Sequence, residues 1–244
     1  MVYWLYKNTY TKGYKLNGER PSLSRYQVFM IAILAFIQFT VILDFMVLSP
    51  LGAILMPKLE ISTSQFGWVV SAYAFSAGIL TAGFADKFDR KKLLLFFYVG
   101  FLIGTALCAS ATTYGFLLFA RIFTGIFGGV IGSVGFAIIT DIFEMKVRSR
   151  VMGFTQMAFA ASQILGLPIG LYLANHYGWY SSFWLIVIVR IIAGLAMVMY
   201  MRPINEHLEV NKNQNPFKHL IGTLSNPDYI KVFLCTILLS TGCL

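Results

Sequence analysis

The stretch GFADKFDRKK at residues 83–92 carries four basic and two acidic side chains, and it leads directly into LLLFFYVGFLIGTALCASA at residues 93–111, which carries no charge. A membrane-spanning helix needs about 20 mainly apolar residues to cross a hydrocarbon core about 30 Å thick. The uncharged run meets that requirement, whereas the charged stretch belongs in water or among lipid headgroups. The sequence here predicts a transmembrane helix that starts at the end of a charged connection.

The same alternation of apolar runs and polar connections continues along the 244 residues. Hydrophobic residues make up 58% of the chain and charged residues 12%, whereas soluble domains have about 45–50% and about 25%. A soluble protein of this size could not bury so much apolar surface, so we expect lipid to surround most of the chain. Six runs are long and apolar enough to span a bilayer: 26–56, 64–84, 93–111, 114–140, 151–174 and 181–201. These runs predict an all-α integral membrane protein.

The basic residues are distributed unevenly among the connections. Most of the 19 lysines and arginines lie in the N-terminal segment and after the second, fourth and sixth helices, whereas Lys58 is the only one in the other three connections. Lysine and arginine gather on the cytoplasmic side of membrane proteins. The pattern predicts a multi-pass protein of the plasma (inner) membrane with a cytoplasmic N-terminus. Because the net charge of +9 follows from this orientation signal, we do not expect nucleic acid as a partner.

The predicted organisation resembles one half of a larger symmetric protein. We expect a cytoplasmic segment at 1–25, a six-helix bundle at 26–201, a cytoplasmic linker at 202–228 and the start of a seventh helix at 229–244. Many membrane transporters are built from two six-helix halves. The expected partner of this chain is therefore a C-terminal six-helix half.

Cysteine and histidine form no recognisable site in the sequence. The three cysteines lie in apolar runs without metal-ligand spacing, and the three histidines are scattered through polar connections. The sequence also lacks a nucleophile–base arrangement and a phosphate-binding glycine loop. We therefore expect neither a metal or other cofactor nor enzymatic activity.

The opening stretch resembles a signature of the major facilitator superfamily, which reads G-x-L-a-D-r-x-G-r-k. Residues 82–91 match it at Asp86 and Arg90 and depart from it at Ala82 and Asp89, where the family has glycine. The resemblance implies that Asp86 and Arg90 form a latch that holds an outward-facing state, with partners in the second half. Without the resemblance, the basic residues of this connection are explained as an orientation signal.

Arg121 lies inside the predicted helix 114–140. An arginine in a membrane helix costs from about 3 to over 10 kcal/mol, so it normally faces protein or water; alternatively, it can extend to the headgroups. Residues 117–129 resemble the family pattern l-x-x-x-R-x-x-q-G-x-g-a-a, which implies a role in proton transfer. The spacing of Gly125 and Gly129 favours close helix packing.

Asp44 lies in the middle of the predicted helix 26–56. A carboxylate in lipid must take up a proton, pair with a cation or face a water-filled cavity; a structural hydrogen bond to a neighbouring helix is the alternative. The Leu43–Asp44 pair resembles a helix-one motif of drug/proton antiporters in the same superfamily. We expect Asp44 and Arg121 to form a proton-coupling pair.

The predicted helix 151–174 contains Gly166, Pro168 and Gly170, which can bend a membrane helix. This run is similar to the antiporter signature g-x-x-x-G-P-x-x-G-G.

Four polar side chains on the second and fifth helices are candidates for a substrate cavity or for hydrogen bonds between helices: Tyr73, Ser76, Gln156 and Gln163.

In their order along the chain, these motifs resemble those in the N-terminal half of a major facilitator superfamily transporter. The resemblance implies proton-coupled efflux, by antiport, of small molecules such as drugs across the lipid bilayer. One alternative is a sugar or metabolite permease of the same superfamily. An alternative of another class is a membrane scaffold or truncated product that does not transport.

Overall fold

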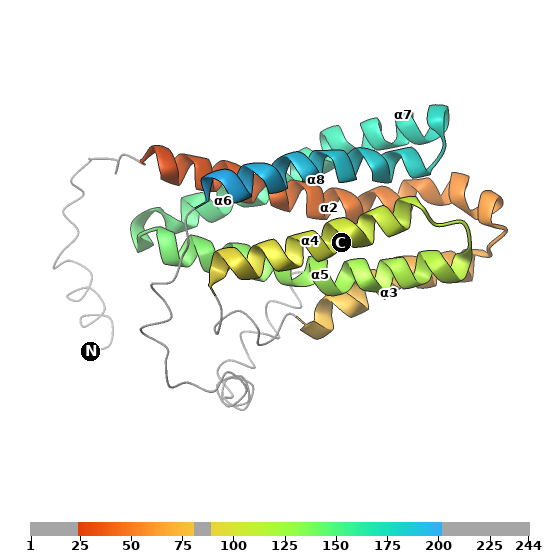
Figure 1. Cartoon of the computed structure of the whole chain (residues 1–244). Helices are drawn as coiled ribbons and strands as arrows, with labels where there is room; N and C mark the ends of the chain where they lie inside the picture. The colour runs from red at the N-terminus through yellow and green to blue at the C-terminus, as the bar shows by residue number, and fades with distance from the viewer. Residues whose placement is uncertain (1–23, 81–88, 202–244) are drawn as a thin grey trace, which may run out of the picture.

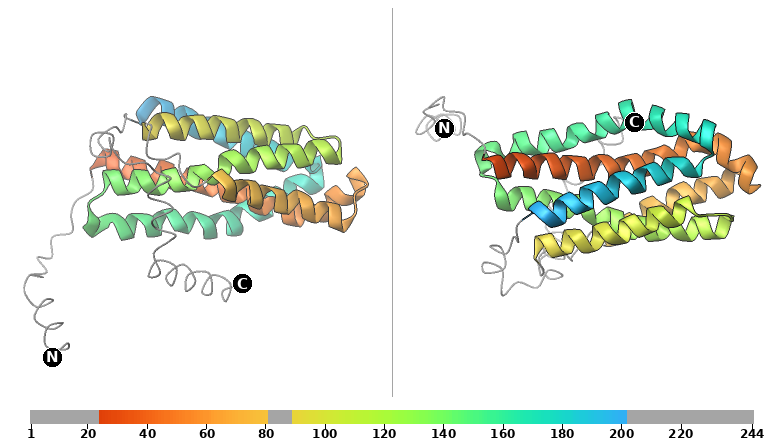
Figure 2. Two further views of the ribbon diagram at one scale, coloured as in Figure 1. Left: turned by 90° about the horizontal axis from the view of Figure 1, so that it is seen from below. Right: turned by 45° about the horizontal axis from the view of Figure 1, so that its top comes forward.

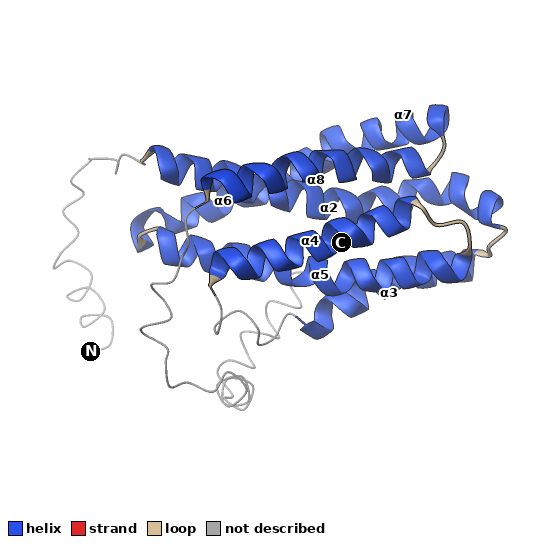
Figure 3. Ribbon diagram, viewed as in Figure 1, coloured by secondary structure: helices blue, strands red, loops and turns tan. Residues whose placement is uncertain are grey.

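The computed structural model describes residues 24–80 and 89–201, and these two ranges contain helices and turns but no strand. The helices lie side by side in one elongated bundle (Figure 1). In chain order they are α2 (Arg25–Leu59), α3 (Thr63–Leu80), α4 (Arg90–Ala109), α5 (Tyr114–Ile142), α6 (Met145–Ala161), the π-helical segment η1 (Ser162–Gly166), α7 (Leu167–Tyr177) and α8 (Tyr180–Tyr200). The all-α fold predicted from the sequence is confirmed (Figure 3).

Five segments of the described ranges are long and apolar enough to cross a membrane: Arg25–Leu59, Arg90–Ala109, Tyr114–Ile142, Met145–Tyr177 and Tyr180–Tyr200. The described part of α3 is not among them, because its first turn is polar. The sequence predicts that this helix reaches residue 84, and residues 81–84 lie outside the described ranges. Large apolar side chains such as Phe75 and Ile192 are exposed on the bundle surface, which is typical of a surface that faces lipid.

Local capping stabilises two short connections, α2–α3 and α4–α5, which lie at one end of the bundle (Figure 1). α2 ends at Leu59 and is followed by the C-cap residue Glu60, which takes the left-handed conformation (φ 53°). Ser62 and Gln65 then form reciprocal side chain–backbone hydrogen bonds of 3.2 and 2.8 Å across the first turn of α3. The Thr113 hydroxyl likewise accepts the backbone N–H of Phe116 at the start of α5.

Asp89 is the N-cap residue of α4, and its carboxylate accepts the backbone N–H of Lys91 at 2.8 Å. An aspartate at this position satisfies a free N–H group and is favoured by the helix dipole. This cap accounts for Asp89 at a position where the family signature has glycine.

The predicted fifth helix follows the path Met145–Tyr177 and is interrupted by η1 immediately before Leu167 and Pro168. Proline has no N–H, and its ring clashes with the carbonyl group four residues earlier in a regular α-helix. The wider π-helical turn accommodates that clash without breaking the helix.

α2 has the most neighbours among the described helices: it contacts α3, α5, α6, η1, α7 and α8. α5 packs against α3 and α4, and α8 packs against α4 and α2 (Figure 2). A side chain in the middle of α2 is therefore surrounded by several other helices. The expected segments 1–23 and 202–244 lie outside the described residues.

Candidate functional site

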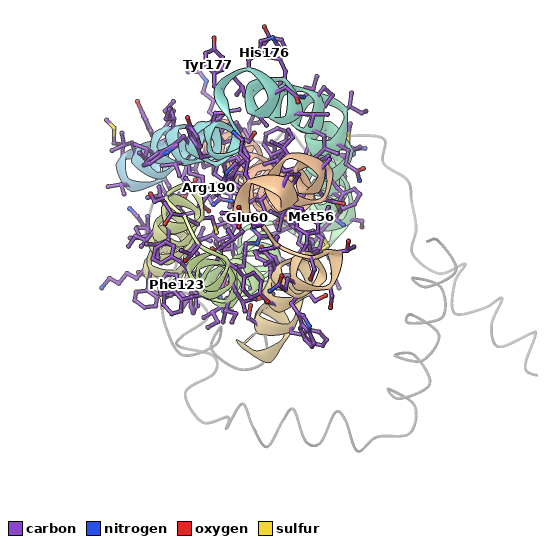
Figure 4. The ribbon with its side chains drawn as sticks, turned by 90° about the vertical axis from the view of Figure 1, so that its right-hand side faces the viewer. Met56, Glu60, Phe123, His176, Tyr177 and Arg190 are labelled. Atoms are coloured by element: carbon purple, nitrogen blue, oxygen red, sulfur yellow. The ribbon has the colours of Figure 1, made fainter. Side chains whose placement is uncertain are left out.

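A charged cluster lies in the interior of the bundle, among α2, α4, α5 and α8. Its members are Asp44 on α2, Thr105 on α4, Arg121 on α5 and Arg190 on α8, and all four are 0% exposed. Figure 4 views the bundle from one end and shows Arg190 inside it, whereas His176 and Tyr177 lie at the outer rim. We refer to these four residues as the Asp44 cluster.

Asp44 and Arg121 are brought together although 77 positions separate them in the sequence. Arg121 Nη1 donates to Asp44 Oδ2 at 3.0 Å and lies 3.4 Å from the Asp44 carbonyl oxygen. The pair joins the middle of α2 to α5. These are the two residues that the sequence predicts as a proton-coupling pair.

The other carboxylate oxygen of Asp44 faces α4 and α8. Thr105 Oγ1 is 3.1 Å from Asp44 Oδ1, and Arg190 Nη1 is 3.8 Å from the same oxygen. Arg190 Nη1 also donates to the Thr105 hydroxyl. The single proton of that hydroxyl has two acceptors within reach, Asp44 Oδ1 at 3.1 Å and the Phe101 carbonyl at 3.0 Å. When it points to Asp44, Thr105 connects the second arginine to the carboxylate.

Aromatic rings cover both guanidinium groups. The Tyr73 ring on α3 lies 4.7 Å from Arg121 Cζ, and the Phe101 ring on α4 lies 3.6 Å from Arg190 Cζ. A cation held over an aromatic face is stabilised by the ring quadrupole, more strongly where water is excluded. The rings therefore compensate part of the cost of burying two cations.

The cluster contains two guanidinium groups and one carboxylate. Arginine stays protonated in proteins, so an ionised Asp44 leaves one positive charge unbalanced. Among the described residues, Nε and Nη2 of Arg121 and Nε of Arg190 are buried without a hydrogen-bond partner. Buried ion pairs contribute little net stability because desolvation opposes the attraction. A buried charge in a membrane protein is instead typical of a functional site.

Close helix packing encloses the cluster. A Cβ atom at Gly125 would lie 2.5 Å from the Tyr73 carbonyl oxygen, and one at Gly129 would lie 2.7 Å from Cα of Ala77. These contacts hold α3 against α5 and place Tyr73 beside Arg121.

The two glycines near Pro168 pack against α2 on either side of Asp44. A Cβ atom at Gly166 would overlap Leu43, and one at Gly170 would lie 2.8 Å from Val47 Cγ2. The Gly170 carbonyl also accepts the Ser182 hydroxyl at 2.6 Å, which ties α7 to α8. Pro168 itself is exposed.

The four predicted cavity residues have different surroundings. Tyr73 belongs to the wall of the Asp44 cluster, whereas the Ser76 hydroxyl donates within α3 to the Tyr73 carbonyl at 3.0 Å. Gln156 is exposed on α6, and Gln163 is half-buried in η1. Of the four, the structure brings Tyr73 to the cluster.

The predicted latch lies partly outside the described residues, because Asp86 falls in the undescribed range 81–88. Arg90, at the start of α4, forms an ion pair with Asp141 near the end of α5, with Nε 3.1 Å from Oδ2. Arg90 therefore has an acidic partner within this half.

Sequence reasoning missed Arg190 and Thr105 as members of the site. Arg190 lies in the predicted helix 181–201, and the rule that singled out Arg121 also applies to it, but no motif marks it. Thr105 carries no charge and belongs to no motif, so only its contacts with Asp44 and Arg190 in the folded structure show its role.

The profile of the Major Facilitator Superfamily matches residues 34–244. The chain belongs to the major facilitator superfamily. The match covers α2 from Leu34 and every later helix that the structure describes, including the four members of the Asp44 cluster.

Similar proteins come from the same superfamily. The chain is 30% identical over 212 residues to "Uncharacterized MFS-type transporter YceJ" of Bacillus subtilis (strain 168), covering 84% of this chain and 53% of that protein. It is 33% identical over 149 residues to "Multidrug resistance protein 3" of the same organism, covering 60% of this chain and 29% of that protein. The chain thus spans about half, or less, of the length of these relatives.

A solved structure shows the same fold. The crystal structure of a bacterial homolog to the human lysosomal transporter Spinster, in an inward-facing and unoccupied conformation, matches with a TM-score of 0.65 at 18% sequence identity. The match covers 74% of this chain and 44% of that chain. The six-helix bundle is therefore the N-terminal half of a membrane transporter fold.

Proposed function

We propose that this chain is the N-terminal half of a proton-coupled secondary transporter that exports small molecules in exchange for protons. The observation that carries the proposal is the ion pair between Asp44 and Arg121, which is fully buried in membrane-spanning helices. A carboxylate in this position can bind a proton, and its charge state determines whether Arg121 has a partner.

Proton binding would act on the helix packing. When Asp44 is ionised, Arg121 binds it and holds α2 against α5. A proton on Asp44 removes the charge that attracts Arg121, so the contact between the two helices weakens. Because the two charge states favour different helix arrangements, protonation shifts the equilibrium between outward-facing and inward-facing states.

The remaining predicted residues would serve the same cycle. We propose that Asp86 and Arg90 form the cytoplasmic latch, and the ion pair of Arg90 with Asp141 supports a structural role for this region. Gln156, which is exposed on the bundle surface, and Tyr73, which covers Arg121, are proposed to line the substrate route with Ser76 and Gln163.

The direction and substrate class rest on similarity. The likeness to a multidrug resistance protein supports export of small, apolar or cationic compounds. Transport would need the second six-helix half, because one half supplies only one wall of a central cavity. The proposed location is the plasma (inner) membrane with the N-terminus in the cytoplasm, in agreement with the distribution of basic residues.

The test is Asp44→Asn in the full-length protein, reconstituted in liposomes with ethidium as the transported probe. We expect export driven by an imposed pH gradient to be lost, because asparagine cannot bind a proton, while the protein still inserts in the membrane. Glu60→Gln is the matched control, since Glu60 is an exposed acidic residue in the connection after α2. Wild-type export by the Asp44→Asn protein would overturn the proposal.

A further inference from the structure

The second arginine of the cluster has a role that the Asp44–Arg121 pair does not explain. Arg121 binds Oδ2 of Asp44, while Oδ1 faces Thr105 at 3.1 Å and Arg190 Nη1 at 3.8 Å. The carboxylate is thus held on both sides, from α5 and from α8. A proton on Asp44 would weaken both attachments at once.

Arg190 is held in place independently of Asp44. Its Nη2 donates to the Thr40 carbonyl at 2.8 Å, and its guanidinium group lies over the Phe101 ring at 3.6 Å. The Tyr98 hydroxyl donates to the backbone carbonyl of Arg190 at 3.0 Å. Two neighbouring helices, α2 and α4, therefore fix the position of this charge, and it cannot move away from Asp44 without breaking several contacts.

The two arginines are the charged groups that face Asp44 in the described part of the chain. The other ionisable neighbours are Tyr73 on α3 and Cys108 on α4, and both types of side chain are ordinarily neutral near pH 7. The segment Met145–Tyr177 also packs on α2. Its ionisable side chains lie in its first two turns and its last two turns, and none lies in its middle.

We propose that Arg190 is a positioning residue that sets the pH at which Asp44 takes up a proton, acting on Oδ1 directly and through the Thr105 hydroxyl. The inference deepens the proposed function and rests on it, because it takes Asp44 as the proton-binding group. An opposite charge within about 4–6 Å favours the ionised form of a carboxyl group. One proton on Asp44 would weaken its contacts with both arginines, Arg121 on α5 and Arg190 on α8.

Infrared spectroscopy tests this role without a transported substrate. In the purified full-length protein, the C=O band of a protonated carboxyl group that is present in the wild type and absent from Asp44→Asn reports the proton on Asp44. We expect Arg190→Gln to move the pH midpoint of this band upward by about one pH unit or more. Arg190→Lys keeps the charge and should restore a midpoint close to the wild type.

Two further variants make the experiment decisive. Arg150→Gln removes one positive charge from an exposed position on α6 and should leave the midpoint unchanged. Thr105→Val keeps both arginines but removes the hydroxyl between Arg190 and Asp44, so we expect an upward shift smaller than that of Arg190→Gln. If Arg190→Gln cannot be purified in folded form, the midpoint of Thr105→Val is used to test the inference.

A midpoint in Arg190→Gln equal to that of the wild type would overturn the inference. If Arg190→Gln does not fold, a wild-type midpoint in Thr105→Val would overturn it. An Arg190→Lys midpoint that shifts as far as Arg190→Gln would also overturn it, because the charge would then not be the cause. These results are distinct from failure of the proposed function, which would appear as normal export by Asp44→Asn. The infrared midpoint can be measured whether or not ethidium is exported.

Discussion

The Asp44 cluster and the Arg90–Asp141 pair both join an aspartate to an arginine, with N–O distances of 3.0 and 3.1 Å, yet they differ in their surroundings. Both side chains of the Asp44–Arg121 pair are 0% exposed, whereas those of Arg90 and Asp141 are 6% and 20% exposed. The cluster also has a second arginine. Similar pair geometry therefore gives different energetics, because water reaches one pair and not the other.

This difference in exposure sets the cost of removing one partner from each pair. A fully buried charge that loses its partner costs about 3–5 kcal/mol, and this cost falls toward the value for a surface pair, about 0–1 kcal/mol, as water reaches the site. The cluster depends on Asp44 more than on either arginine, since Asp44 is the single anion shared by two cations.

The largest effect on stability is expected from Asp44→Asn. This change leaves two buried guanidinium groups without a counter-charge, so we expect it to reduce the free energy of unfolding by about 3–5 kcal/mol. Arg190→Gln should cost less, because Asp44 and Arg121 then remain as a neutral pair. Thermal unfolding of the purified full-length protein measures both, and a larger loss for Arg190→Gln would contradict this account of the charges.

The next effect concerns the packing that encloses the cluster. Gly129→Ala places a methyl group against the backbone of Ala77, and such overpacking typically costs about 1–3 kcal/mol. Gly135→Ala is the matched control, because it lies on the same helix and a Cβ there would have no neighbour within 4 Å. The same unfolding measurement should show a loss for Gly129→Ala and none for Gly135→Ala. Equal stability of the two variants would mean that α3 and α5 can separate at little cost.

The smallest effect is expected at the periphery. Asp141→Asn removes the partner of Arg90 from a site that water reaches in part, so we expect a loss of about 1 kcal/mol. Raising the salt concentration from about 0.05 to 0.5 M should reduce this loss, because mobile ions screen exposed charges. The loss caused by Asp44→Asn should not change with salt. A salt dependence shared by both variants would remove the distinction between the two sites.

The sequence predicted much of this fold and part of the site. The apolar runs located the helices, because length and hydropathy determine which segments can enter lipid. The pairing of Asp44 with Arg121 was also predictable, since a charge in a membrane helix needs a partner. The π-helical turn before Pro168 was not predicted, because it depends on local backbone geometry.

The amino-acid order alone specifies that the chain spans a membrane and that its buried charges must be compensated. The free energy of transfer from water to lipid differs so much between apolar runs and polar connections that tertiary contacts cannot reverse which of them enters the membrane. Which group compensates which charge is set by the packing of the helices. Thr105 and Arg190 are 85 positions apart, and they meet at Asp44 because α8 packs against both α4 and α2. Opposite charges compensate each other only when they lie close together in space, and the packing of the helices sets the distance between them.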